Sequence, residues 1–180
     1  MAEIKSSLEL AMERTKGMAI SKEEKEEIKQ KEIVEKANGL SHRYQEDHLP
    51  LHEVLREIER MEEKKGKTVK EILLSQWIDA LSLKDEDERL LKGIESLKPK
   101  RIDELKEKHQ HLSSQYQKEK EAVRHKVKKE LMESLRGVGI DGDAVEPNIE
   151  GSDLWKNENE KLDFSYRIKL GEIKEQLREL

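Results

Sequence analysis

The chain has 180 residues, of which 43% are charged and only 33% belong to the hydrophobic set. This ratio provides too little apolar material for a large globular core, but enough for narrow seams between helices. Aromatic residues make up only 3% of the chain, which argues against a β-sandwich or an aromatic-walled cofactor pocket. With 36 basic and 41 acidic residues the formal net charge is −5, so bulk attraction to nucleic acid or anionic lipid is not implied.

Cysteine is absent, which excludes disulfides, thiolate metal ligands and a cysteine nucleophile and favours the reducing cytoplasm. The first twenty residues lack an apolar signal core, and no window approaches 18 apolar residues. We therefore expect a cytoplasmic chain that is neither secreted nor inserted into a membrane.

The N-terminal part of the sequence predicts two helices. The first has apolar residues at intervals of four and three and is expected to end near Lys16. Ser21 and Glu24 form a capping-box pattern that begins the second. We expect this second helix to stop at Asn38-Gly39, because glycine suits a left-handed C-terminal cap.

Three further helices are expected before residue 100. One follows Pro50 and is closed by Gly66, and Thr68 with Glu71 forms a capping box for the next. That next helix is apolar on nearly all sides, as is typical of a helix buried among others, and its Trp77 marks the predicted centre of the core. A short helix then carries the apolar residues Leu90, Leu91, Ile94 and Leu97.

The C-terminal part predicts a long helical hairpin. Residues 100–136 contain neither Gly nor Pro and should form one long helix, whereas residues 137–152 hold four glycines and a proline and form a loop. Ser152 can cap a last helix. The first of these helices carries 11 basic and 7 acidic residues, and residues 141–180 carry 6 and 11, so charge favours contact. The short connection favours an antiparallel arrangement.

The apolar stripes of the two helices have matching gaps of four, seven and four residues. A reversed alignment places Val127 beside Leu162 and Leu112 beside Leu177, so that four apolar layers coincide. The pattern leaves open whether the contact lies within one chain or is exchanged between two. The predicted interaction seam comprises Leu105, Leu112, Tyr116, Val123, Val127, Leu162, Tyr166, Ile173 and Leu177.

One segment of the last helix also has the pattern of a β-strand. Apolar and polar residues alternate through Leu162, Phe164, Tyr166, Ile168 and Leu170. Because the sequence offers no partner strands and a lone strand cannot satisfy its backbone, a helix is favoured and a strand is the alternative.

Two groups of residues resemble ligand sites but fit ordinary turns better. Gly66-Lys67-Thr68 is similar to the end of a phosphate-binding loop, but Met61 replaces the required earlier glycine. Asp141 and Asp143 flank a glycine as in calcium loops, yet the downstream oxygen ligands are not correctly spaced. Neither motif therefore predicts a ligand.

A metal or catalytic site is likewise not predicted. His42, His48 and His52 lie close together and could bind a divalent metal with Glu53, but solvated histidines at helix ends are the preferred interpretation. No carboxylate pair can be singled out without a pocket, and no serine lies in a nucleophile elbow. We expect no catalytic residue, no cofactor and no metal.

The segment Lys118–Lys129 contains six basic residues against two acidic ones. Binding of phosphate groups is the functional interpretation of this composition. Pairing with acidic residues of the same chain is the alternative and is favoured by the opposite charges of the two long helices. The candidate phosphate contacts are Lys118, Lys120, Arg124, Lys126, Lys128 and Lys129.

Two segments resemble a small family of uncharacterised bacterial helical proteins: the opening Met1–Lys16 and the loop Gly139–Asn148. The resemblance implies a helical fold and carries no known activity or site residues. The Lys/Glu-rich helical composition is also similar, more weakly, to coiled-coil stalk subunits of rotary ATPases.

The sequence therefore predicts an all-α protein with two regions. Residues 1–99 form a helical region with its core around Trp77, and residues 100–180 form a long antiparallel helical hairpin or coiled-coil extension. We expect a non-catalytic interaction or scaffold protein that contacts itself as a homodimer, or an unknown protein partner, through coiled-coil-like surfaces. A nucleic-acid-binding protein using Lys118–Lys129 and an enzyme of unknown class are the alternatives.

Overall fold

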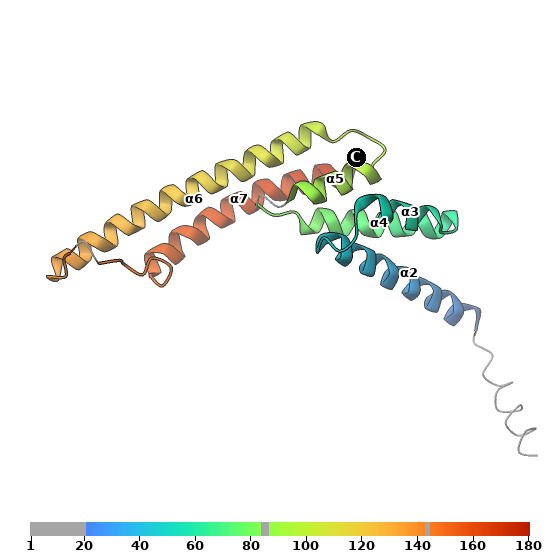
Figure 1. Ribbon diagram of the computed structural model, residues 1–180, viewed down its shortest axis with the longest axis horizontal. Helices are drawn as coiled ribbons and strands as arrows, with labels where there is room; N and C mark the ends of the chain where they lie inside the picture. Colours follow the sequence, from blue (N-terminus) through green and yellow to red (C-terminus); the bar gives the residue numbers. More distant parts are fainter. Residues whose placement is uncertain (1–20, 84–86, 143–144) are drawn as a thin grey trace, which may run out of the picture. The chain divides into compact units, whose positions relative to one another are not determined.

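The computed structural model describes residues 21–83, 87–142 and 145–180 (Figure 1). Every regular element in these residues is an α-helix, which confirms the all-α class predicted from the sequence. The packing divides the chain into two compact units, of which the first ends at Ile72 and the second comprises Leu73–Leu180. The predicted regions 1–99 and 100–180 stay a prediction, because a division of packing does not test which part folds as a domain.

The first unit contains α2 (Lys22–Gln45), α3 (Leu51–Glu59) and the beginning of α4 (Glu63–Ala80). The capping box predicted for α2 is confirmed: the Glu24 amide donates to Ser21 Oγ at 3.0 Å, and the Ser21 amide donates to the Glu24 carboxylate at 2.8 Å. Lys36 of α2 and Glu57 of α3 form an ion pair at 3.8 Å. The predicted first helix, expected to end near Lys16, lies outside the described residues.

The predicted end of α2 at Asn38-Gly39 is wrong, because the helix continues to Gln45. Its buried stripe includes Ala37, Leu40 and Tyr44, at intervals of three and four residues, so burial of this face carries the helix past the glycine. Gly39 lies on the exposed side of the helix.

The predicted break at Gly66 and the capping box at Thr68 are also wrong. Gly66 lies inside α4, where its amide donates to Glu62 O at 2.9 Å, and the Thr68 hydroxyl donates back to Lys64 O at 3.2 Å. A Cβ at position 66 would lie 3.2 Å from Ile58 O. The glycine therefore allows a close approach between helices instead of ending one.

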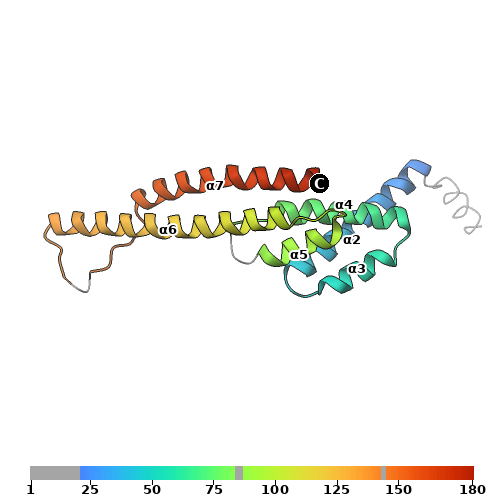
Figure 2. The same cartoon turned by 90° about the horizontal axis from the view of Figure 1, so that it is seen from above.

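The second unit contains the end of α4, then α5 (Glu88–Leu97), α6 (Asp103–Gly137) and α7 (Asp153–Glu179). The predicted short helix is confirmed as α5, and all four of its predicted apolar residues are buried. The indole of Trp77, which marked the predicted core, is 0% exposed. α6 and α7 lie side by side and run in opposite directions (Figures 1 and 2).

The loop between α6 and α7 contains glycines with positive φ angles and ends at a helix cap. Gly139 and Gly142 have φ angles of 81° and 152°, which side-chain-bearing residues rarely adopt. The predicted cap at Ser152 is confirmed, since its hydroxyl accepts the Trp155 amide at 3.2 Å.

A buried polar cluster ties the segment between α4 and α5 to α6. The Asp87 carboxylate accepts the Ser82 amide at 2.6 Å, and His109 Nε2 lies 2.8 Å from Ser82 O and 3.3 Å from Asp87. Because a carbonyl oxygen only accepts, this nitrogen is the donor. Ser113 Oγ also donates to Leu83 O at 3.0 Å. Satisfied buried polar groups of this kind fix one arrangement of the backbone, and we call this cluster the Asp87–His109 latch.

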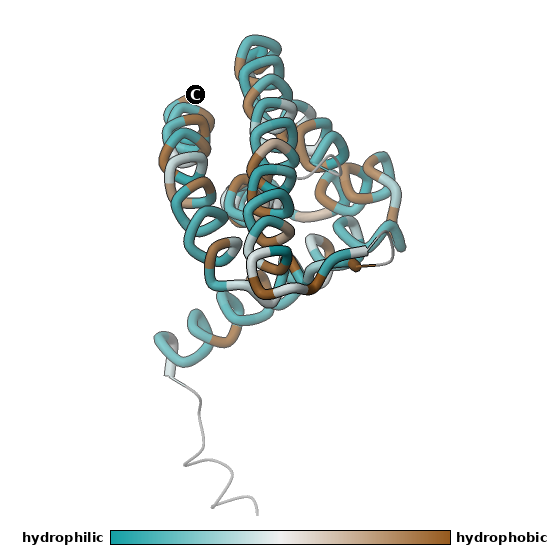
Figure 3. Tube along the Cα trace, turned by 90° about the vertical axis from the view of Figure 1, so that its left-hand side faces the viewer, coloured by the Kyte–Doolittle hydropathy of each residue, from teal (hydrophilic) through white to brown (hydrophobic). Residues whose placement is uncertain are grey.

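Hydrophilic residues dominate the helices, and hydrophobic residues recur along them at intervals (Figure 3). This pattern matches the low apolar content of the sequence, with burial confined to one side of a helix at a time. Among the described residues, no helix combines the length and the apolar character that crossing a lipid bilayer requires.

Gly39 and Gly66, which lie inside described helices of the first unit, give a matched test of the two different roles of glycine. Replacing Gly39 by Ala should stabilise the unit by about 0.5–1 kcal/mol, because glycine weakens a helix interior. A Cβ there meets nothing within 4 Å. Gly66→Ala should gain less or destabilise, because its methyl group presses on the Ile58 carbonyl. Urea denaturation followed by circular dichroism measures both, and equal gains would contradict the close approach at Gly66.

Candidate interaction surface

The contact between α6 and α7 is an apolar seam. α6 contributes the buried residues Leu105, Leu112, Tyr116 and Val127, and α7 contributes the buried residues Tyr166, Leu170, Ile173 and Leu177. The other two residues of the predicted seam, Val123 and Leu162, are partly exposed. The structure thus places every residue of the predicted seam at partly or fully buried positions.

The register of the seam differs from the predicted one. The rings of Tyr116 and Tyr166 meet edge to face, with centroids 5.4 Å apart and planes at 62°. The reversed alignment of apolar gaps placed Tyr116 beside Ile173 instead, so that prediction is wrong by seven residues, or about two helical turns. The gaps alone do not select the register, because a shift of α7 by seven residues also sets apolar residues of the two helices opposite one another. The aromatic contact and the polar groups around it decide between the two registers.

A set of hydrogen bonds surrounds the two tyrosine rings at the middle of the seam. Tyr116 Oη donates to Asp163 Oδ1 at 2.7 Å, and Asn159 Nδ2 donates to Asp163 Oδ2 at 2.9 Å. Lys120 Nζ donates to Tyr116 Oη at 3.1 Å. We call Tyr116, Lys120, Asn159, Asp163 and Tyr166 the tyrosine clasp. Sequence reasoning did not identify this set, because Asn159 and Asp163 resemble ordinary surface residues and Lys120 was singled out only as a phosphate contact.

The clasp changes the acidity of both phenols. Burial raises the pKa of Tyr166 to about 12, and the nearby Glu119 carboxylate adds to the effect. Burial and the hydrogen bond to Asp163 also raise the pKa of Tyr116, although Lys120 opposes them. The ammonium groups of Lys120 and Lys169 lie over the two rings, 5.2 and 4.6 Å from the centroids, where cation–π attraction is expected.

α7 is apolar on two opposite sides, and only one of them faces α6. The side chains of Phe164 and Ile168 are 66% and 52% exposed. Residues two positions apart on a helix point about 200° away from each other, so Phe164 and Ile168 face away from Tyr166 and Leu170. The alternation that resembled a strand is therefore two apolar helix faces, and the predicted helix is confirmed. We call the side with Phe164 and Ile168 the outer face of α7.

The basic segment of α6 does not form one continuous face. Lys120, Arg124 and Lys128 lie in one row along the helix, since they are four residues apart, whereas Lys118, Lys126 and Lys129 lie together on the roughly opposite side. Most of these side chains have acidic or phenolic neighbours. Besides Lys120 in the clasp, the ion pairs are Arg124–Glu150 at 3.6 Å, Lys126–Glu130 at 3.9 Å and Lys129–Glu133 at 3.9 Å. Nucleic-acid binding by this segment stays a prediction.

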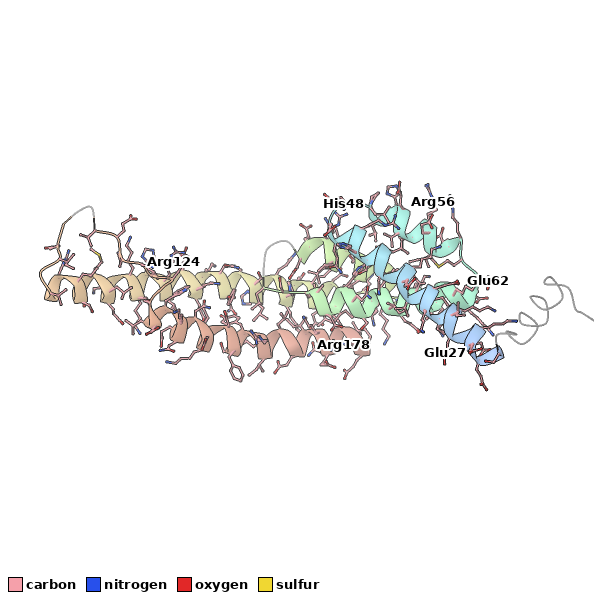
Figure 4. All side chains as sticks on the ribbon, turned by 90° about the horizontal axis from the view of Figure 1, so that it is seen from below. Glu27, His48, Arg56, Glu62, Arg124 and Arg178 are labelled. Atoms are coloured by element: carbon pink, nitrogen blue, oxygen red, sulfur yellow. The ribbon has the colours of Figure 1, made fainter. Side chains whose placement is uncertain are left out.

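A polar groove of about 500 Å³ lies between this row and the loop before α7. Arg124 lies on α6 (Figure 4). It lines the groove and pairs with Glu150. The lining carries both signs of charge: Glu121, Arg124, His125, Lys128, Glu146, Pro147, Asn148, Ile149 and Glu150. Because carboxylates are mixed with the basic groups, the groove has no strong preference for an anion or a cation.

Some of the candidate metal ligands of the sequence have other partners in the structure. His42 Nδ1 and His48 Nδ1 lie 3.3 and 3.4 Å from the two oxygens of the exposed Glu46 carboxylate. Asp141 accepts the Gly142 amide at 3.0 Å and pairs with Arg136 at 3.2 Å, as turn chemistry predicts. Within the described part of the chain, no group of three or more His, Asp or Glu side chains is placed to hold a metal ion. His52 and Glu53 are exposed on α3, and Asp143 lies outside the described residues.

The Asp87–His109 latch contains the residue types of a hydrolase triad but not its geometry. Asp87, His109 and Ser113 are 6%, 2% and 5% exposed, so a substrate cannot reach them. The Ser113 hydroxyl donates to a backbone carbonyl rather than to the imidazole. A nucleophilic serine would have to donate its hydrogen bond to the histidine, which acts as the base. The geometry of this cluster therefore supports the fold instead of a reaction.

No protein family, curated protein or solved structure matches the chain. Its function is therefore inferred from the described residues. Among their exposed apolar side chains, Phe164 and Ile168 lie four residues apart on one face of a helix.

The clasp predicts a specific titration of tyrosine. An unfolded tyrosine ionises near pH 10, whereas Tyr166 holds its proton up to about pH 12. The stability that this difference contributes is complete below pH 10 and is lost as the pH rises to about 12. The tyrosinate absorbance of the wild type and of Tyr166→Phe should therefore be compared as the pH rises. The additional absorbance of the wild type, which comes from Tyr166, should appear near pH 12. Its appearance near pH 10 in the folded protein would contradict the burial of this phenol.

Proposed function

We propose that this chain is a non-catalytic helical interaction protein whose hairpin presents the outer face of α7 to another helix. The observation that supports the proposal is the exposure of Phe164 and Ile168 on the side of α7 that faces away from α6. Phe164 is the single phenylalanine of the chain. The chain has few apolar residues, and two large ones lie side by side on an exposed helix face. Left in water, they do not contribute the free energy that their burial would provide.

Covering this pair gives a direct energetic reason for association. Burying a phenylalanine or isoleucine side chain contributes about 1.5–3 kcal/mol relative to leaving it in water. Aromatic residues flanked by charged ones are typical of the centres of protein–protein contacts, where the charged residues form the rim. Lys161 and Glu172, both exposed on α7, supply such a rim.

The seam between α6 and α7 supports the same proposal. The helix has its other side fixed by the tyrosine clasp, so the outer face is held on a rigid element and little conformational entropy is lost when a partner binds. A catalytic function has no comparable support, because the buried polar cluster at Asp87 and His109 is closed to substrate.

The proposal predicts that charge on the outer face removes the partner. In affinity isolation from the native cell, Phe164→Glu/Ile168→Glu should lose the chains that the wild type binds, a second copy of this chain included. The matched control is Val138→Glu/Ile140→Glu, which changes two other exposed apolar residues, 72% and 50% exposed, in the loop after α6. The control should bind the same chains as the wild type. Identical recovery by all three proteins would overturn the proposal.

A further inference from the structure

We infer that the occupant of the outer face of α7 is the same face of a second copy of this chain, running antiparallel to the first. The inference rests on the proposed function and adds the identity of the partner and its orientation. It follows from the order of large, small and charged residues along the outer face.

The outer face is a row of six residues with gaps of four, three, four, three and four. Such spacing keeps the residues on one stripe of the helix, as in the seam of a coiled coil. The row spans about 27 Å at the usual helical rise. Its members are Asn157, Lys161, Phe164, Ile168, Gly171 and Glu175, and all of them are at least partly exposed.

A twofold axis between Phe164 and Ile168 makes this row complementary to itself. Each Phe164 then opposes Ile168 of the second copy, which buries the exposed apolar pair of both chains. The next layer sets Lys161 against Gly171 of the second copy. A Cβ at Gly171 would meet nothing within 4 Å, so this position offers space for the long stem of a lysine.

The outermost layer is polar and also complementary, because it sets the amide of Asn157 against the carboxylate of Glu175. Beyond it, Arg178 is held by Asp79 and Glu175 of its own chain, so the row ends there. Mid-helix glycine is unfavourable by itself, and the layer of Lys161 and Gly171 supplies a reason for it.

The charges on the flank of the row select the antiparallel direction. Lys161 and Glu172 lie on the same flank, about 20° apart around the helix axis. Reversal brings each Lys161 to the height of Glu172 of the second copy, which forms two equivalent ion pairs. A parallel pair would instead set Lys161 against Lys161 and Glu175 against Glu175, which is repulsive. Lys161 pairs with Glu158 of its own helix, at 2.8 Å on the exposed surface, and exposed pairs of this kind are weak.

An unrelated helix would fit equally well only if its charges had the same order in reverse. A second copy of this chain, running antiparallel, presents that order. With one apolar layer on each side of the axis, the contact should be reversible, with a dissociation constant in the micromolar range of about 1–100 µM.

The test uses charge reversal in the full chain. Lys161→Glu and Glu172→Lys should each weaken the dimer about tenfold, because each replaces two attractive pairs by two repulsive ones. The double variant should dimerise as the wild type does. A mixture of the two single variants should form a mixed dimer more tightly than either variant pairs with itself, because every pair across it is again attractive. Sedimentation equilibrium from about 5 to 500 µM measures all four.

A second measurement reports on the outer face itself. Growth on 4-fluorophenylalanine labels Phe164 alone, since it is the single phenylalanine. Its fluorine resonance should shift with protein concentration in the wild type and in Lys161→Glu/Glu172→Lys, and less in either single variant. Ile168→Glu should abolish the shift at all concentrations tested.

Three results would overturn the inference. They are a wild-type chain that remains a monomer at about 500 µM, a dimer that Ile168→Glu leaves intact, and single variants that the double variant does not rescue. A monomeric chain whose outer face still binds another protein in the affinity isolation would overturn only the identity of the partner. A monomer that binds nothing through this face would overturn the proposed function as well.

Discussion

The hydrogen bond between Tyr116 and Asp163 lies at the middle of the long seam between α6 and α7. An apolar stripe permits a helix to rotate and slide against its partner, because leucine packs against leucine in several registers. A buried phenol whose hydroxyl has one carboxylate partner does not, since any slip would leave both groups desolvated without a hydrogen bond. The edge-to-face contact with Tyr166 restricts the rotation further. Together these contacts decide which side of α7 faces α6.

That decision also determines what the other side presents. Once Tyr166 and Leu170 point toward α6, Phe164 and Ile168 must point away from it, and the apolar pair becomes a surface instead of a core. A rotation of α7 by half a turn would exchange the two faces and bury the pair. Polar groups at the seam therefore have a consequence beyond stability, because they fix the position of the interaction surface. Buried polar contacts have the same role where they set the register of coiled coils.

The helices and the buried core residues could be predicted from the sequence, because hydrophobic periodicity indicates which side of a helix is buried. The helix ends could not be predicted correctly where a glycine was taken as the end signal. Gly39 was expected to end α2, but burial of Leu40 and Tyr44 beyond it outweighs the local cost of glycine. Gly66 was expected to end a helix. The structure shows instead that a glycine is needed there because the Ile58 carbonyl lies beside it. Both errors arose because a tertiary contact overrode a local preference.

The register and the outer face needed the structure. A shift by seven residues keeps apolar residues opposite one another, so the gap pattern cannot select the register. Nothing in the sequence marks Asp163 and Lys120 as the residues that decide it. The alternation through Phe164 and Ile168 did contain the relevant signal: in a helix, alternating apolar residues imply two apolar sides, one of which lacks an internal partner.

The most direct measurement of this account is a double-mutant cycle on Tyr116→Phe and Asp163→Ala, followed by urea denaturation. If the clasp holds the seam, the two residues should show a coupling free energy of about 1–3 kcal/mol, because the pair is a partly buried hydrogen bond to a charged group. A coupling within about 0.3 kcal/mol of zero would mean that the two residues act independently, and the seam would then owe its register to something else.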